Sequence, residues 1–282
     1  MGSLSVDCMV SLTHTSLATA DDLPNELILS IFPLLPLQSL IAARCVNQRW
    51  RNLVPLADLL PTRRKYLDFY LSVVRSPAFQ EARRAIHPHL KHFDREEYLR
   101  FLTKTSTAPE EFILWVREWP ASAVCGWMWP GLEGQAYQES ALHWMPGSWS
   151  IPISHNPPYM KFVTFSGGKT PYDGTTLHAT TVLPAALADL GVRMDTSASG
   201  WDEGRKEEAS IEITVLCLGG GRAYVLDGKR GGEALAGIVY QVSGSYTMHK
   251  NKIVAKSWLE LLQKDLKAAE VWYLNLPSAR VM

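Results

Sequence analysis

The sequence predicts an α+β protein in which helices come first and strands with a few helices follow. Apolar residues make up 46% of the 282 residues and charged residues 20%, as in a globular protein. Apolar side chains recur at helical spacing as far as Pro120, after which β-branched and aromatic runs take over. We therefore expect a flexible tail at 1–20, a three-helix domain at 21–60, a helical linker at 61–120 and an α+β domain at 121–282.

Three short helices are predicted within residues 21–60. Asp22 is placed to cap the first helix, and Pro36 ends that helix and starts the second. The third helix carries Trp50 and ends before Pro55. A domain this small cannot bury so many apolar side chains alone, so we expect it to need a partner surface.

Amphipathic helices are predicted throughout the linker. One spans residues 63–75, with aromatic and branched side chains on one side. The segments Asp94–Glu97 and Thr107–Glu110 have the spacing of capping boxes, so each should begin a helix. Pro120 should end the last of them.

Six segments of the last domain read as strands. They are residues 161–165, 177–183, 211–218, 222–227, 235–242 and 271–275. Three consecutive glycines at 219–221 predict a hairpin turn between two of them. Helices are predicted at 184–191 and from Ser257 onward, where Glu260 completes a capping box.

Two motifs resemble sites for phosphate or metal but lack what such sites require. Ser166–Thr170 ends like a phosphate-binding loop, yet Val163 stands where the loop needs glycine, and Pro171 disfavours the helix that should follow. His87, His89 and His92 do not share one helical face, so a solvated helix end is favoured over a zinc site.

No motif for a nucleophile or a converging acid–base pair is present either. We therefore expect no catalytic residue, no metal, no cofactor and no enzymatic activity. The Trp-rich stretch at 126–131, with Trp144 and Trp149, is expected to be core packing, with a peptide-binding groove as the alternative.

Charge and cysteine usage restrict the partners and the compartment. Basic and acidic residues balance at 28 each and the pI is near 7.1, which disfavours nucleic acid as a partner. The four cysteines form no CxxC motif, as expected in a reducing compartment. No apolar stretch is long enough to span a membrane, and no signal peptide is evident. The predicted location is the cytosol or the nucleus.

The segment from Leu23 to Leu53 resembles an F-box. The residues that match the family pattern are Leu23, Pro24, Glu26, Ile31, Phe32, Leu35, Pro36, Leu40, Val46, Arg49 and Trp50. Pro33 and Gln38-Ser39 depart mildly from that pattern. The resemblance implies docking on the small Skp-type adaptor of SCF-type cullin–RING ubiquitin ligases, and through it on a cullin. It implies that the adaptor is bound by Leu23, Pro24, Ile31, Phe32, Leu35, Pro36, Leu40, Val46 and Trp50.

The C-terminal half resembles the SUKH superfamily, the Smi/Knr-like domain of fungi and bacteria. The resemblance is carried by Gly219–Gly228, by the Gly-rich hairpin Gly231–Tyr240 and by Val254–Leu262, where Ser257 precedes an aromatic-led helix. An F-box joined to such a domain is similar to an expanded group of fungal proteins. SUKH domains are regarded as binding or immunity modules, so the resemblance carries no catalytic residue over.

Together these features predict a substrate receptor of an SCF-type ubiquitin ligase. The F-box would dock the adaptor, and the α+β domain would hold an unidentified protein target. The alternative is an interaction or stress-signalling scaffold that binds the adaptor without presenting a substrate. A small-molecule enzyme ranks last because no converging site is evident.

Overall fold

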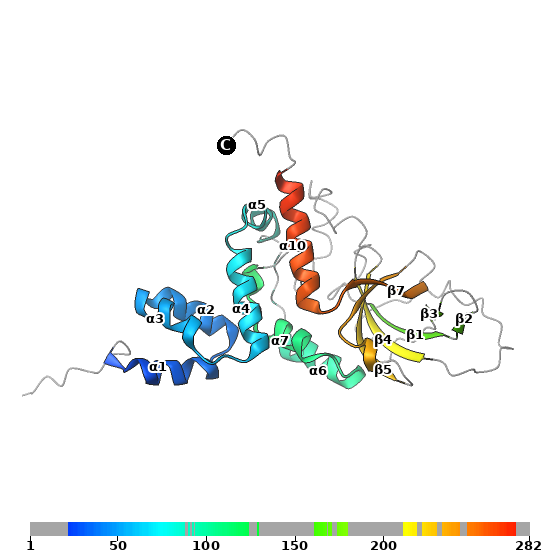
Figure 1. The fold of residues 1–282 in the computed structure, drawn as a ribbon, viewed down its shortest axis with the longest axis horizontal. Coiled ribbons are helices and arrows are strands. Elements are labelled where there is room, and N and C mark those ends of the chain that lie inside the picture. Colours follow the sequence, from blue (N-terminus) through cyan, green and yellow to red (C-terminus); the bar gives the residue numbers. More distant parts are fainter. Residues whose placement is uncertain are drawn as a thin grey trace, which may run out of the picture. The chain divides into compact units, whose positions relative to one another are not determined.

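A computed structural model gives the fold of the chain (Figure 1). It describes residues 22–87, 90, 92, 94–123, 129, 161–167, 169–170, 174–179, 211–218, 222–229, 233–242 and 247–274. Two compact units are present. One comprises residues 1–35 and 39–59, and the other comprises residues 36–38 and 60–282. The tail at 1–20, the helix at 184–191 and the glycines at 219–221 lie outside the described residues.

The first unit is built from short helices, as predicted. They are α1 (Asn25–Ile31), the 3₁₀ helix η2 (Phe32–Leu34), α2 (Leu37–Val46), α3 (Gln48–Leu53) and the 3₁₀ helix η3 (Val54–Leu56). The residue preceding α1 is Pro24, so the expected cap by Asp22 is wrong. Asn47 caps α3, because its side-chain oxygen accepts a hydrogen bond from the amide of Trp50 at 2.8 Å.

The second unit contains the other helices of the described residues. They are α4 (Pro61–Val73), α5 (Pro77–Ile86), α6 (Arg95–Thr105), α7 (Glu110–Glu118), the 3₁₀ helices η5 (Ala121–Ala123) and η6 (Glu233–Leu235), and α10 (Trp258–Leu274). Asp94 caps α6 as predicted, since its carboxylate accepts a hydrogen bond from the Glu97 amide at 2.9 Å. Thr107 does not cap α7, because Pro109 directly precedes that helix.

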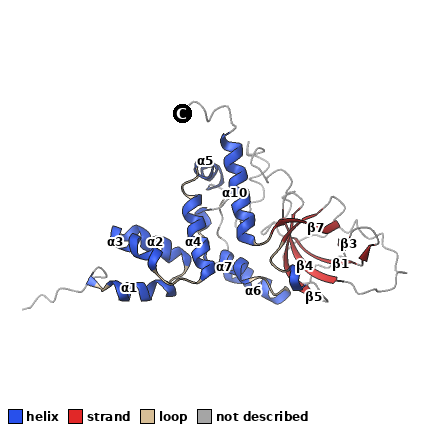
Figure 2. Ribbon diagram, in the orientation of Figure 1, coloured by secondary structure: helices blue, strands red, loops and turns tan. Residues whose placement is uncertain are grey.

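The strands of the second unit pair in antiparallel order β1-β4-β5-β6-β7-β3-β2. They are β1 (Lys161–Gly167), β2 (Lys169–Thr170), β3 (Gly174–Ala179), β4 (Ile211–Leu218), β5 (Arg222–Lys229), β6 (Val239–Val242) and β7 (Thr247–Ala255) (Figure 2). Leu218 pairs with Arg222, which confirms the predicted β4–β5 pairing across the glycines. Because β1 also pairs with β3, the strand ladder closes on itself.

An aromatic cluster joins the helices to the sheet. The ring of Phe112 on α7 lies 5.4 Å from that of Tyr224 on β5 and 4.8 Å from that of Trp258 on α10. The ring of Trp115 lies 4.9 Å from Trp258 and 5.1 Å from Trp129. All five side chains are buried, so Trp129 is core packing, as expected. The rest of the Trp-rich stretch, with Trp144 and Trp149, lies outside the described residues.

This cluster crosses the boundary that the sequence places between residues 120 and 121. The structure groups the helices of the predicted linker with the sheet in one unit. The physical reason is the apolar face of α7, where Phe112, Leu114, Trp115 and Val116 are all buried. An amphipathic helix of only nine residues needs such a surface to stay folded.

The chain end differs from the prediction in one element. Residues 271–274 continue α10, so the strand expected at 271–275 is wrong. The helix α10 contacts α4, α5 and α7, and its own Trp258, Leu261 and Leu262 side chains are buried. The helix that begins at Trp258 continues through the sequence Val-Trp-Tyr-Leu, so its continuation outweighs the strand propensity of these four residues. The strand β7 was not predicted, because its residues 249–252 are all polar.

Candidate adaptor-docking site

Large apolar side chains lie on the outside of the first unit. On α1, Leu27 and Ile31 are exposed and share a helix face, because they are four residues apart. Leu34 in η2 is 81% exposed, Val46 at the end of α2 is 58% exposed, and Leu56 in η3 is also exposed. Isolated exposed leucines are common on proteins, but this many on a unit of this size indicate a partner surface.

The residues predicted to bind the adaptor separate into an inner and an outer set. Phe32 and Leu40 have no exposed surface at all. The outer residues, exposed or half-buried, are Leu23, Pro24, Ile31, Leu35, Pro36 and Val46. Pro36 belongs to the second compact unit, although Leu35 directly precedes it in the chain.

Trp50 is half-buried and packs against the inner set. Its ring meets that of Phe32 edge to face, with the ring centroids 5.6 Å apart. Its indole nitrogen is buried without a hydrogen-bond partner, so the ring contributes by apolar packing. In this structure the fully buried Phe32 and Leu40 present no surface to a partner.

A polar frame fixes the start of α1 against α3. The guanidinium group of Arg49 donates to the side-chain oxygen of Asn25 at 2.9 Å and to the backbone carbonyl of Leu23. Arg49 matches the family pattern, but the sequence did not assign it to the site. Leu27 and Leu34 were also missed as surface residues, because a helical period alone does not say which apolar side chains stay outside.

The other motifs found in the sequence supply no second site in the described residues. Lys169 and Thr170 form the strand β2, paired with β3, where a phosphate-binding loop would have a helix. No group of three His, Cys, Asp or Glu side chains able to hold a metal ion occurs in the part of the chain that the structure describes. Within that part, no helix is both long and apolar enough to cross a membrane.

Comparison with known proteins agrees with this N-terminal surface. Residues 20–58 match the family model described as F-box-like. No curated protein and no solved structure matches the chain. F-box domains in general bind Skp-type adaptors, and through them a cullin. The chain therefore carries an F-box-like domain at residues 20–58, and large apolar side chains of this domain are exposed.

Proposed function

We propose that this protein is a substrate-receptor subunit of an SCF-type cullin–RING ubiquitin ligase. The observation that carries the proposal is the F-box-like domain at 20–58, whose Ile31, Leu34 and Val46 side chains lie in solvent. Covering apolar side chains is the main favourable contribution to most protein–protein association. The outer residues contact the adaptor, while Phe32, Leu40 and Trp50 give that surface its shape.

The second unit holds the protein target in this proposal, and it is a SUKH-like binding domain. The order of its elements supports this assignment. Strand β5 includes Leu226-Asp227, the strand pair β6–β7 follows, and Ser257 precedes the aromatic-led helix α10. The protein itself is not an enzyme, and the ubiquitin-transfer chemistry belongs to other subunits. We place it in the cytosol or the nucleus.

A matched pair of variants tests adaptor docking. The chain has a Leu-Pro pair inside the F-box-like domain, Leu35-Pro36, and another just outside it, Leu60-Pro61. Full-length Leu35→Ala/Pro36→Ala should lose co-purification with a Skp-type adaptor, while Leu60→Ala/Pro61→Ala should retain it. Equal retention by both variants would contradict the proposal.

Reconstituted ubiquitylation separates the receptor from the scaffold alternative. Proteins captured by the second unit should be ubiquitylated when the full chain is combined with adaptor, cullin and RING subunits. They should remain unmodified with the Leu35→Ala/Pro36→Ala variant. Adaptor binding without modification of any captured protein would favour the scaffold.

A further inference from the structure

Helix α2 begins without an N-cap of its own. Pro36 precedes α2 (Leu37–Val46), and its side chain offers no hydrogen-bond acceptor. The first turn of α2 contains no acidic residue either. The amide of Leu37, the first residue of the helix, donates instead to the carboxylate of Glu118 at 2.7 Å. Glu118 ends α7, 81 residues further along the chain. Residues 36–38 and Glu118 belong to the same compact unit.

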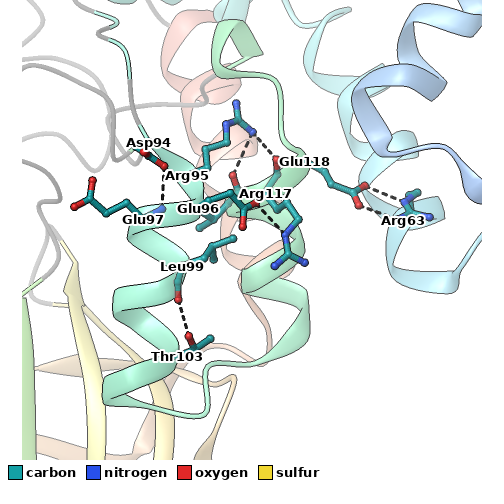
Figure 3. A network of polar contacts seen from close by, with 10 residues as sticks. Arg63, Asp94, Arg95, Glu96, Glu97, Leu99, Thr103, Arg117 and Glu118 are labelled. Atoms are coloured by element: carbon teal, nitrogen blue, oxygen red, sulfur yellow. Dashed lines mark hydrogen bonds and ion pairs between the residues drawn. The ribbon is translucent and has the colours of Figure 1, made fainter.

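The Glu118 carboxylate is itself held firmly. Its side chain is only 9% exposed, and burial of a carboxylate is costly unless the charge is paired. Arg63 on α4 pairs it in a fork: Nε donates to Oε2 at 2.9 Å and Nη2 donates to Oε1 at 2.7 Å (Figure 3). Hydrogen bonding to Glu118 raises the pKa of Arg63, so the guanidinium remains charged.

The backbone around Glu118 is fixed as well. Arg95 donates to the carbonyls of Val116, Arg117 and Trp119 at 3.2, 2.9 and 2.8 Å, which satisfies acceptors at the end of α7. Its guanidinium also lies 5.0 Å from the ring centroid of Trp129. The carbonyl of Trp119 further accepts from the side chain of Gln38 at 3.5 Å.

We infer that Glu118 and Arg63 are positioning residues for adaptor binding, although both lie outside the F-box-like domain. The inference rests on the proposed function. Leu37 directly follows Leu35 and Pro36, two of the residues proposed to contact the adaptor. By accepting the Leu37 amide hydrogen, Glu118 fixes the backbone of residues 36–38, and with it Pro36, within its own unit.

Two double variants isolate the role of the acceptor. Both Arg63→Met/Glu118→Gln and Arg63→Met/Glu118→Met remove the ion pair, so neither leaves a buried charge unpaired. Only glutamine can still accept a hydrogen bond from the Leu37 amide. The measurements are the affinity of each full-length variant for a purified Skp-type adaptor and the hydrogen-exchange protection of the Leu37 amide. The melting temperature of each variant reports its folding.

The exposed pair Arg117–Glu96 provides the matched control. Its two side chains are 53% and 67% exposed, with Nε and Oε1 3.5 Å apart (Figure 3). Arg117→Met/Glu96→Gln should bind the adaptor as the unmodified chain does. We expect Arg63→Met/Glu118→Met to bind the adaptor between about twofold and about thirtyfold more weakly than the unmodified chain does, which is the range for loss of a helix cap. Arg63→Met/Glu118→Met should also lose the hydrogen-exchange protection of the Leu37 amide. Arg63→Met/Glu118→Gln should recover both the affinity for the adaptor and that protection.

The outcomes separate this inference from the proposed function. If the unmodified chain binds no adaptor, the proposed function fails and the inference fails with it. If all variants bind the adaptor equally, or if the Leu37 amide stays protected in Arg63→Met/Glu118→Met, adaptor docking stands and the positioning role is overturned. Equal losses of adaptor affinity and of melting temperature in the two Arg63/Glu118 variants would also overturn the positioning role, because the ion pair would then matter only for folding.

Discussion

In the described part of the second unit, two ion pairs join side chains that are buried or largely buried. Arg63 pairs with Glu118, and Arg222 on β5 pairs with Asp265 on α10 through contacts of 2.7 and 3.0 Å. In the second pair, desolvation by burial is the largest effect and raises the pKa of the Asp265 carboxyl, while Arg222 opposes it. The sequence did not predict either pair, because the partners are 55 and 43 residues apart.

The raised pKa of Asp265 predicts a pH dependence of stability. The folded state holds this proton more tightly than the unfolded state, in which the carboxyl has its ordinary pKa of 3.8. The contribution of Asp265 is therefore full below pH 3.8 and falls as the pH rises through the raised pKa. The Asp265→Asn variant cannot ionise, so its unfolding free energy should improve relative to that of the unmodified chain across this range.

Denaturant unfolding of both proteins at a series of pH values measures this difference. The opposite trend, in which the unmodified chain gains on Asp265→Asn as the pH rises, would mean that attraction by Arg222 outweighs burial. Glu96→Gln is the control, since that exposed carboxylate should leave the trend unchanged.

At the scale of elements, local signals predicted the side-chain caps that begin α6 and α10, but not the Asn47 cap of α3. Ser257 accepts from the Glu260 amide at 3.1 Å at the start of α10, as its sequence spacing indicated. Glu111 of α7 also accepts from the Trp258 amide at 3.0 Å, and no local pattern could reveal that bond. The same limit applies to α2, whose first amide is capped by a residue far along the chain. Caps supplied by distant elements depend on the tertiary fold.

Helix α7 should be required for the sheet to fold. A fragment of residues 121–282 lacks Phe112 and Trp115, which contact Tyr224 and Trp258. Loss of each buried aromatic side chain costs roughly 3–5 kcal/mol, and a whole domain is stable by only about 5–15 kcal/mol. Residues 60–282 should therefore melt cooperatively, whereas 121–282 should melt without cooperativity and bind a hydrophobic dye.

Calorimetry of the two fragments, with dye fluorescence, measures this requirement. A cooperative melt of residues 121–282 alone would instead support the boundary that the sequence places at residue 120, with α7 only resting on an independent domain.

For the whole molecule, the sequence predicted the F-box-like domain much better than the second unit. The F-box pattern is compact, and residues such as Leu23, Phe32 and Trp50 lie within one short segment, so their spacing alone identifies the domain. Which of these residues are exposed depends on how the short helices pack. Only the structure therefore shows that Ile31 is exposed while its neighbour Phe32 is buried. The second unit joins segments far apart in the chain, so neither the pairing of β1 with β3 nor the inclusion of residues 36–38 could be predicted.

Calorimetric titration of the full chain with a purified Skp-type adaptor tests the central claim most directly. Ile31 and Ile253 are 41% and 47% exposed, so Ile253→Ser outside the F-box-like domain is a matched control for Ile31→Ser inside it. We predict one-to-one binding with a negative heat-capacity change, weakened by Ile31→Ser and unchanged by Ile253→Ser. No binding by the unmodified chain, or equal binding by both variants, would contradict adaptor docking through this surface.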